Sequence, residues 1–462
     1  MAKEENTKTI DQSQKVSLKE KISFALCNLG NIPLMTLLNT YFLIFYTDVV
    51  GLDAAALATL FLISKVVDAI SDPLTGFLLD HVKPTKHGKF RPLLIIGTII
   101  CCINYVLLWF GAAWSPVYKY VIVYVTYLLL GFTFDIMDIS LNSLLPVMTT
   151  DNEERNSLST IKGIAYTVGA LIISAVAPYI VAESTLENYY ILIFLFVAVT
   201  LVFSIVGALG VKERVKFTDS EGEQDNYSIK DLFKFLFMQP VIVYFLSNLL
   251  GTVAANVYSG SSTYFYTYVM GDLTISSTIS IIVTVAEFPA MILTPIFADK
   301  IGKKKTYGIG LALQGLSMLL RLISPTSLAL NYACGAITGF GSAMVMTLGY
   351  GIQADNTTYV QYKTGKHAEG AISSLSSLIT KVAQGIGGAV PGYVLAWTGY
   401  VANAEVQSAS AIAGIDACFL IIPAILNIAG GIVIWVFYNI TKQDVTEMSA
   451  AIAERDAETG NA

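Results

Sequence analysis

Ionised side chains fall inside stretches of the sequence that are otherwise apolar. The segment ISKVVDAISDPLTG carries Lys65, Asp68 and Asp72, whose spacing of three and four residues places all three on one face of a helix. Asp135 and Asp138 share a helical face in the same way in FDIMDISLNS. An ionised side chain at the centre of a bilayer costs about 2.5–3.5 kcal/mol even on the most lenient scale, so each of these residues needs a partner or a function.

Further charges interrupt other apolar stretches, namely Lys162, Glu287 and Lys381. Without Glu287, the acids of this set outnumber the amines by one negative charge. A bound Na⁺ or a proton would restore neutrality, and Na⁺, like other hard cations, prefers oxygen ligands. Crowded carboxylates also favour protonation, so the residue types leave Na⁺ and H⁺ open. Ion pairs that only hold helices together are the structural alternative.

Amide side chains accompany these charges. Asn28 and Asn31 lie about one helical turn apart in the first apolar stretch, and Asn142 follows Asp138 by four residues. An amide inside a membrane helix either binds the hydroxyl groups of a ligand such as a sugar or bridges two helices. Both interpretations remain open from these residues alone.

The elements that must hold these residues are membrane-spanning helices. The chain has 462 residues, of which 54% are hydrophobic and only 13% are charged, which excludes a water-soluble enzyme and a disordered protein. A helix that spans a bilayer needs about 20 apolar residues. The apolar stretches predict twelve such helices, at 22–47, 54–80, 92–112, 117–147, 157–182, 189–210, 240–269, 274–298, 306–325, 327–354, 368–399 and 412–438.

The distribution of Lys and Arg predicts the orientation. Most of the 28 Lys and Arg residues fall in the two tails and in the loops that lie on the same side as the tails. Because cytoplasmic loops carry the excess of positive charge, both termini are expected in the cytoplasm. The polar stretch at 1–21 is too long for the charged part of a cleavable signal, so we expect a multi-pass protein of the cell inner or plasma membrane that keeps its first helix.

The chain also repeats itself. Asp80 and Asp299 each end a helix and precede a short basic loop, and these loops contain Arg91 and Lys303. A carboxylate at such a helix end can pair with a basic group and hold the cytoplasmic side shut, which predicts a gate of these four residues. Glu287 precedes Asp299 as Asp68 precedes Asp80. It is therefore either a second titrating group or an acid capped by a polar neighbour.

The repeat predicts two six-helix bundles, the architecture of major facilitator transporters. SIKDLFKFLF, between the bundles, has the apolar spacing of a helix that lies along the membrane surface. The predicted parts are a cytoplasmic tail at 1–21, a bundle at 22–210, a cytoplasmic linker at 211–239, a bundle at 240–438 and a cytoplasmic tail at 439–462.

Catalytic signatures are lacking in the sequence. The three His residues fall in predicted cytoplasmic loops, no metal or nucleophile spacing occurs, and the phosphate-binding pattern of an ATP-driven pump is absent. The five Cys residues lie in apolar stretches and are expected to be buried. We expect no enzyme, no cofactor other than a coupling ion, no nucleic-acid partner, and a monomer in the lipid bilayer.

Several segments together resemble one family of transporters. They are KVVDAISDPLTGFLLD followed by HGKFRP, TFDIMDISLNSLLP, ERNSLSTIKG, ADNTTYVQYKTGKHAEGAISSLSSLITK, and YTDVVGL at the end of the first helix. They resemble the melibiose permease-like family of glycoside-pentoside-hexuronide:cation symporters, from about residue 17 to about residue 440.

The resemblance implies roles for individual residues. Asp68 and Asp72 match acids that coordinate the coupling cation, Na⁺ in a sodium-coupled member. Asp138 matches an acid that binds sugar hydroxyls, and Lys162 stands where the family usually has an Arg near the sugar. Lys381 matches a Lys linked to both sites.

Three departures from the family pattern qualify these roles. Ile32 replaces an acid that binds galactosides in the family, so specificity for a galactoside such as melibiose is not expected. Asn142 replaces a Trp near the sugar and removes a stacking surface. Asp135 replaces a cation-binding Thr, which adds a carboxylate to the cation site and bears on the choice between Na⁺ and H⁺.

We therefore expect a secondary active transporter that moves a sugar, glycoside or sugar acid with Na⁺ or H⁺ by alternating access. The alternatives are a lysolipid or drug carrier of the same fold and a membrane sensor that does not transport. The expected cation-binding residues are Asp68, Asp72 and Asp135, and the expected substrate-binding residues are Asp138, Lys162, Lys381, Asn142, Asn31 and Asn28.

Overall fold

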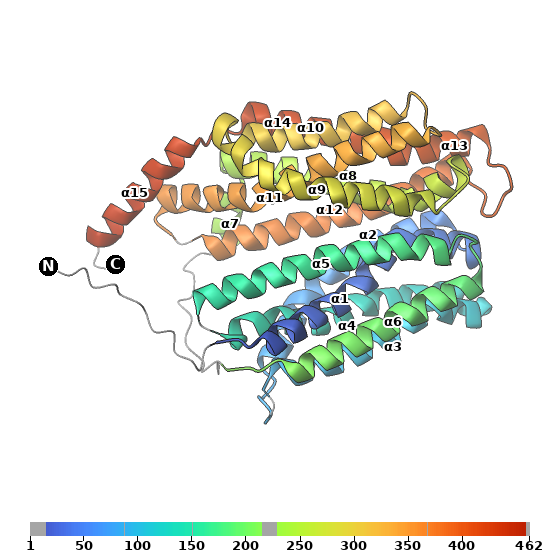
Figure 1. Ribbon diagram of the computed structural model, residues 1–462, viewed down its shortest axis with the longest axis horizontal. Helices are drawn as coiled ribbons and strands as arrows, with labels where there is room; N and C mark the ends of the chain where they lie inside the picture. Colours follow the sequence, from blue (N-terminus) through green and yellow to red (C-terminus); the bar gives the residue numbers. More distant parts are fainter. Residues whose placement is uncertain (1–14, 87, 150, 215–228, 367, 459–462) are drawn as a thin grey trace. The chain divides into compact units, whose positions relative to one another are not determined.

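The protein is helical throughout the part that the computed structural model describes, which comprises residues 15–86, 88–149, 151–214, 229–366 and 368–458 (Figure 1). All twelve predicted spans are helices. They are α1 Leu18–Ile44, α2 Ala54–Asp80, α3 Phe90–Trp114, α4 Lys119–Met148, α5 Asn152–Ile180, α6 Leu186–Gly210, α8 Gln239–Tyr264, α9 Ile275–Ile301, α10 Lys303–Arg321, α11 Leu328–Thr364, α12 Glu369–Thr398 and, as one span, α13 Ala409–Asp416 with α14 Ile422–Phe437.

Two shorter helices lie outside these spans. The amphipathic segment of the predicted linker forms α7, Ile229–Leu236, and buries Phe235 among apolar side chains of the C-terminal half. The second, α15, Lys442–Glu458, lies in the stretch expected to be a tail and packs beside α11. The sequence did not predict α15 because its polar composition carries no membrane signal, although Met448 is buried there.

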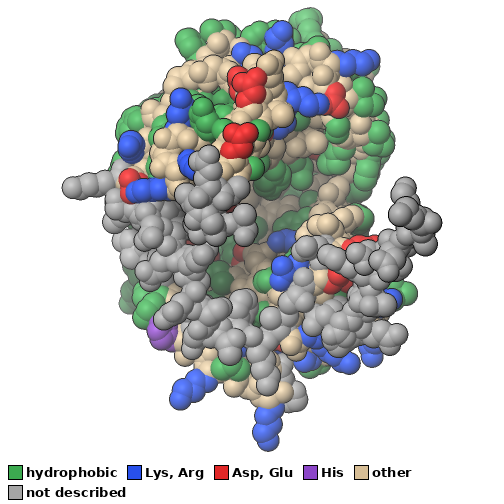
Figure 2. Space-filling view, turned by 90° about the vertical axis from the view of Figure 1, so that its left-hand side faces the viewer, with side chains coloured by type: hydrophobic (Ala, Val, Ile, Leu, Met, Phe, Trp, Pro, Cys, Tyr) green, Lys and Arg blue, Asp and Glu red, His purple; other side chains and the backbone are tan. Residues whose placement is uncertain are grey.

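The helices suit a bilayer. Within the described residues, nine helical segments are long and apolar enough to cross a membrane. On the face drawn in Figure 2, Lys, Arg, Asp and Glu side chains lie among polar and hydrophobic groups.

The chain divides into two compact units. Unit 1 comprises residues 1–38, 66–173 and 185–220, and unit 2 comprises residues 39–65, 174–184 and 221–462. In unit 1, α3 packs closely along α4, where Gly97 leaves room for the backbone of Met137. Close packing through small residues is the usual way in which membrane helices associate.

Unit 2 includes the end of α1 and the first half of α2. This part of α2 packs against three glycines of α12. Gly385 contacts the side chain of Lys65, Gly388 contacts Phe61, and Gly392 contacts the carbonyl oxygen of Ala54. A Cβ at Gly385 or Gly392 would collide with these atoms. The glycines therefore permit a close approach of α2 to α12.

A wide helical turn occurs at the same place in both halves of the chain. The π-helical segment Phe45–Val49, with sequence FYTDV, ends α1, and the π-helical segment Phe265–Val269, with sequence FYTYV, ends α8. Each is closed two residues later by a glycine with positive φ, Gly51 at 71° and Gly271 at 75°. Such π-turns are frequent at functional sites.

One charge lies deep inside unit 2. Arg321 ends α10 and is fully buried, with its guanidinium 6.0 Å from the ring centroid of Tyr258 and 5.7 Å from that of Phe419. Its Nη1 donates to the Tyr258 hydroxyl at 3.3 Å, while Nε and Nη2 have no hydrogen-bond partner among the described residues. The sequence analysis did not predict the burial of Arg321 between aromatic rings.

Candidate functional site

Asp138 is the centre of a hydrogen-bonded group in unit 1 that joins three helices. Asn31 of α1 donates from Nδ2 to Asp138 Oδ1 at 2.6 Å, and Asn142 of α4 donates from Nδ2 to Asp138 Oδ2 at 2.8 Å. Lys162 of α5 donates from Nζ to the Asn142 amide oxygen at 2.5 Å. Four residues predicted to bind substrate therefore lie in one chain of contacts.

The order of these hydrogen bonds decides which groups carry charge near Asp138. Lys162 reaches Asp138 through the Asn142 amide, and its Nζ also lies 5.8 Å from the centre of the Tyr166 ring. Both carboxylate oxygens of Asp138 accept from amides, which are neutral donors. Donors, acceptors and one cation thus lie within reach of a polyhydroxylated ligand.

Asn28 lies apart from this group. It is fully buried on α1, and its Nδ2 donates to the carbonyl oxygen of Phe24 at 2.7 Å, one turn earlier in the same helix. The structure brings Asn31 to Asp138 but gives Asn28 a bond within its own helix.

The predicted cation-binding acids lie along α2 and α4 of unit 1. A Cβ on Gly131 would collide with Oδ1 of Asp68, so the carboxylate of Asp68 rests directly against α4. Asp135 lies one turn after Gly131 on α4, and Asp72 one turn after Asp68 on α2. Within the described residues, no three His, Cys, Asp or Glu side chains converge closely enough to hold a metal ion, so these three acids do not form a closed cage.

Two of the predicted amines belong to unit 2. Lys381 is half-buried on α12, and the stem of Lys65 packs against Gly385, one turn further along that helix. Glu287 on α9 is half-buried and hydrogen-bonds to Ser342 of α11. This contact corresponds to the capped acid among the two interpretations of Glu287.

Two residues of the predicted gate contact other helices. Arg91 donates from Nε to the Ala208 carbonyl oxygen at 2.8 Å and from Nη2 to that of Leu209 at 2.9 Å, which ties α3 to the end of α6. Lys303 pairs with both oxygens of Asp355 on α11, at 2.7 and 2.8 Å.

A third residue of the predicted gate also contacts another helix. Asp299 pairs with Lys442 of α15 at 2.9 Å, where both side chains are largely exposed. The side chain of Asp80 lies outside the described part of the structure.

A buried acid that sequence reasoning quoted but gave no role lies in unit 2. Asp48 is 6% exposed and accepts from the Tyr400 hydroxyl at 2.6 Å and from the Tyr268 hydroxyl. The Asn403 amide donates to its backbone oxygen. The sequence signal was available: FYTDV and FYTYV are near-identical pentapeptides at matching places in the two halves.

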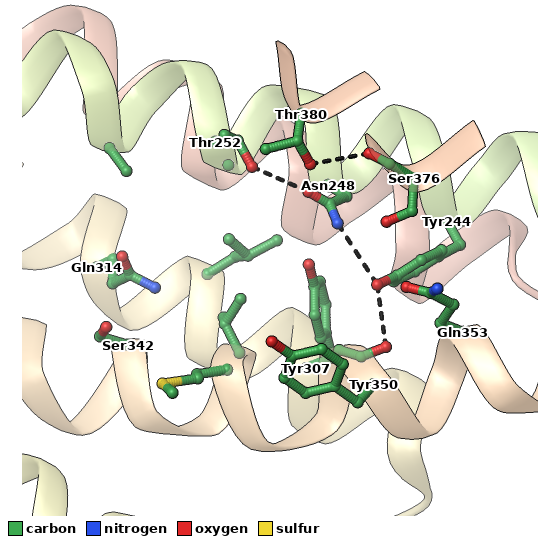
Figure 3. A pocket seen from close by; sticks show the side chains of 16 residues that line it. Tyr244, Asn248, Thr252, Tyr307, Gln314, Ser342, Tyr350, Gln353, Ser376 and Thr380 are labelled. Atoms are coloured by element: carbon green, nitrogen blue, oxygen red, sulfur yellow. Dashed lines mark hydrogen bonds between the residues drawn. The ribbon is translucent and has the colours of Figure 1, made fainter. Parts of the chain in front are cut away.

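A polar cavity of about 360 Å³ also escaped prediction. It opens among α8, α10, α11 and α12 of unit 2 (Figure 3). Among the residues that line it are Asn248, Thr252, Gln314, Gln353 and Thr380. The sequence offers no pattern that joins Asn248 to side chains of three other helices.

Solved structures share this fold. The chain superposes on a crystal structure of a D-xylose-proton symporter with a TM-score of 0.64 at 17% identity, over 92% of this chain and 98% of that one. It superposes on a crystal structure of the nucleoside transporter NupG with a TM-score of 0.62 at 15% identity, over 91% of this chain and 100% of that one.

Curated relatives match along nearly the whole chain. The isoprimeverose transporter of Lactiplantibacillus pentosus is 32% identical over 96% of this chain and 93% of its own length. The glucuronide carrier protein homolog of Escherichia coli is 30% identical over 96% of this chain and 97% of its own length. The family model described as MFS/sugar transport protein matches residues 23–442. The chain is thus a multi-pass membrane transporter, not an enzyme, and belongs to the MFS/sugar transport protein family.

Proposed function

We propose that the chain carries a sugar, a glycoside or a sugar acid across the membrane together with Na⁺ or H⁺. The observation that carries this proposal is the Asp138 group, in which an acid, two amides and an amine from three helices are joined by hydrogen bonds. Carboxylates and amides pair with sugar hydroxyls, and their placement inside a membrane is explained by a ligand that uses them. The printed names of the relatives, an isoprimeverose transporter and a glucuronide carrier homolog, support the same class of substrate.

Lys162 lets the Asp138 group accept either a neutral or an acidic sugar. Its ammonium group is held by the amide oxygen of Asn142 and not directly by Asp138. A carboxylate or sulfonate of a ligand can displace that neutral amide and pair with Lys162, whereas a neutral sugar leaves the chain of contacts intact. The same group therefore serves both kinds of substrate, and the net charge of the ligand decides whether Lys162 is engaged.

Asp68, Asp72 and Asp135 are proposed to carry the coupling ion. The contact of Asp68 with Gly131 brings an acid of α2 to the helix that also holds Asp135 and Asp138. Binding of Na⁺ or H⁺ there lowers the negative charge near Asp138 and so changes its affinity for substrate. By reciprocity, bound substrate changes the affinity for the ion by the same factor.

Asp48 is proposed to hold one end of the transporter closed during alternating access by hydrogen bonds to the C-terminal helices. Its carboxylate accepts hydroxyls from Tyr268, after α8, and from Tyr400, after α12. Thr47, beside it, lies 2.8 Å from the hydroxyl of Tyr264. Opening at this end requires these bonds to break. With both termini in the cytoplasm, as the charge distribution predicts, the end of α1 faces outward and Asp48 belongs to an outer closure.

Uptake into proteoliposomes tests the proposal. A panel of labelled neutral sugars, glycosides and uronic acids is offered to the purified protein, with Na⁺ and pH gradients imposed separately. Accumulation of at least one member of the panel, driven by one gradient, is expected. Flux of lysolipid without any sugar accumulation would overturn the proposal in favour of a lipid carrier.

A further inference from the structure

We infer that the cavity inside unit 2 is a second carbohydrate subsite, built for an uncharged sugar ring. The inference rests on the proposed function and adds a binding site within the C-terminal helices. The volume of about 360 Å³ falls within the range of small-molecule sites. Tyr350, which lines the cavity, is 76% exposed, so the cavity reaches the surface of unit 2 at this side chain.

The lining of the cavity carries no Asp, Glu, Lys, Arg or His. Its polar groups are amides and hydroxyls, supplied by Asn248, Thr252, Gln314, Ser342, Gln353, Ser376 and Thr380 together with three Tyr residues. A charged ligand would find no counter-charge there, and its desolvation would be uncompensated. The cavity therefore favours a neutral ligand, in contrast to the Asp138 group with its acid and amine.

One side of the cavity is fixed by its own hydrogen bonds. Thr252 Oγ1 donates to the Asn248 amide oxygen at 2.9 Å, and the Tyr244 hydroxyl donates to the carbonyl oxygen of Gly349 at 2.9 Å (Figure 3). Asn248 Nδ2 points to the Tyr244 hydroxyl at 3.4 Å. These hydrogen bonds orient the polar groups before a ligand binds, which reduces the loss of conformational entropy on binding.

Two amides are left over for a ligand. The side chains of Gln314 on α10 and Gln353 on α11 form no hydrogen bond with any described residue, and Figure 3 shows them toward opposite ends of the cavity. Each amide offers two donors and an acceptor, which is the combination that vicinal hydroxyl groups require. Two free amides facing one neutral cavity are explained by a polyhydroxylated ligand between them.

The remaining walls suit the faces of a sugar ring. Tyr307 and Tyr350 present aromatic rings, and Leu311, Val345 and Met346 supply apolar surface against which C–H groups can pack.

Cysteine protection tests occupancy of the cavity. Ser376→Cys places a thiol in the lining, while all five native cysteines are buried and give little background. A neutral sugar that the protein transports is expected to slow labelling by N-ethylmaleimide at least fivefold. Gln443→Cys, on the exposed face of α15, is the matched control and should label at an unchanged rate. Unchanged labelling of Ser376→Cys at a sugar concentration that saturates binding in calorimetry would overturn the inference.

The double variant Gln314→Leu, Gln353→Leu tests the two amides directly, because Leu keeps most of the volume. The Kd for the neutral sugar is expected to rise at least tenfold, with thermal unfolding within a few degrees of the unchanged protein. An unchanged Kd would leave the cavity as a water-filled space and overturn the subsite. If the protein without substitutions accumulates no sugar, the proposed function itself is wrong. If uptake is intact but the labelling of Ser376→Cys and the Kd of the double variant are both unchanged, only the subsite is wrong.

Discussion

Asp48 and Tyr268 occupy the same position in two copies of one pentapeptide, and the hydroxyl of Tyr268 donates a hydrogen bond to the carboxylate of Asp48. Both copies are π-helical turns that end long helices, α1 and α8. The two halves of the chain are therefore joined through equivalent positions that differ in one residue: an acceptor in the first copy and a donor in the second.

Replacing Asp48 by Asn should slow transport more than it weakens binding. The carboxylate accepts from Tyr268, Tyr400 and Thr47, and hydrogen bonds to a charged group contribute about 1.5–3 kcal/mol each. Loss of these bonds destabilises the closed end, so initial uptake should fall at least fivefold while the Kd for sugar stays within about threefold. Uptake and calorimetry measure the two quantities. Tyr264→Phe, which loses only a bond between two neutral hydroxyls, should have a smaller effect; wild-type uptake by Asp48→Asn would refute the role of this closure.

Truncation of the Asp138 group should weaken substrate binding. Asp138→Ala and Lys162→Ala each remove one member of the chain of contacts, and we expect a rise in Kd of more than tenfold, which corresponds to about 1.4 kcal/mol or more. Asn31→Ala should act in the same direction. Asn28→Ala is the matched control on α1, because its amide bonds within its own helix, and its Kd should stay within about twofold. Equal effects of Asn31→Ala and Asn28→Ala would contradict the assignment.

Neutralising the acids of α2 should uncouple transport from the ion gradient. Asp68→Asn and Asp72→Asn keep the size of the side chain but cannot carry the charge or the proton of the coupling step. Gradient-driven accumulation should vanish, whereas exchange of labelled for unlabelled sugar at equal concentrations should persist. Both quantities are measured in proteoliposomes with Na⁺ and pH gradients imposed in turn. Full accumulation by both variants would remove these acids from the ion site.

Gly131→Ala should impair coupling through Asp68 alone. The added methyl group would occupy the position of Asp68 Oδ1 and push the carboxylate away from α4. We expect a drop of at least fivefold in gradient-driven accumulation, with little change in thermal stability. Gly163→Ala on α5 is the control, since a Cβ there meets no atom within 4 Å. Identical behaviour of the two variants would show that the contact of Asp68 with α4 has no part in coupling.

The helices and the polar residue types were predictable from sequence, but the partners were not. Apolar length and charge located every span, because a bilayer imposes those properties on each helix separately. Lys303 was predicted to be a gate residue, but its partner Asp355, 52 residues later in the chain, could not be predicted from local sequence. Asn28 and Asn31 looked alike in sequence, and only the rotation of α1 decides which of them meets Asp138. The cavity of unit 2 is lined by residues from four helices, so no local sequence pattern predicts it.

Arg321 has an electrical consequence inside unit 2. Its guanidinium is held by aromatic rings and, among the described residues, forms no ion pair with a carboxylate, so its charge is not cancelled. In a low-dielectric interior an uncompensated positive charge sets up a potential that extends well beyond its contacts and repels small cations. The C-terminal helices thus carry a buried positive charge that disfavours a small cation beside it.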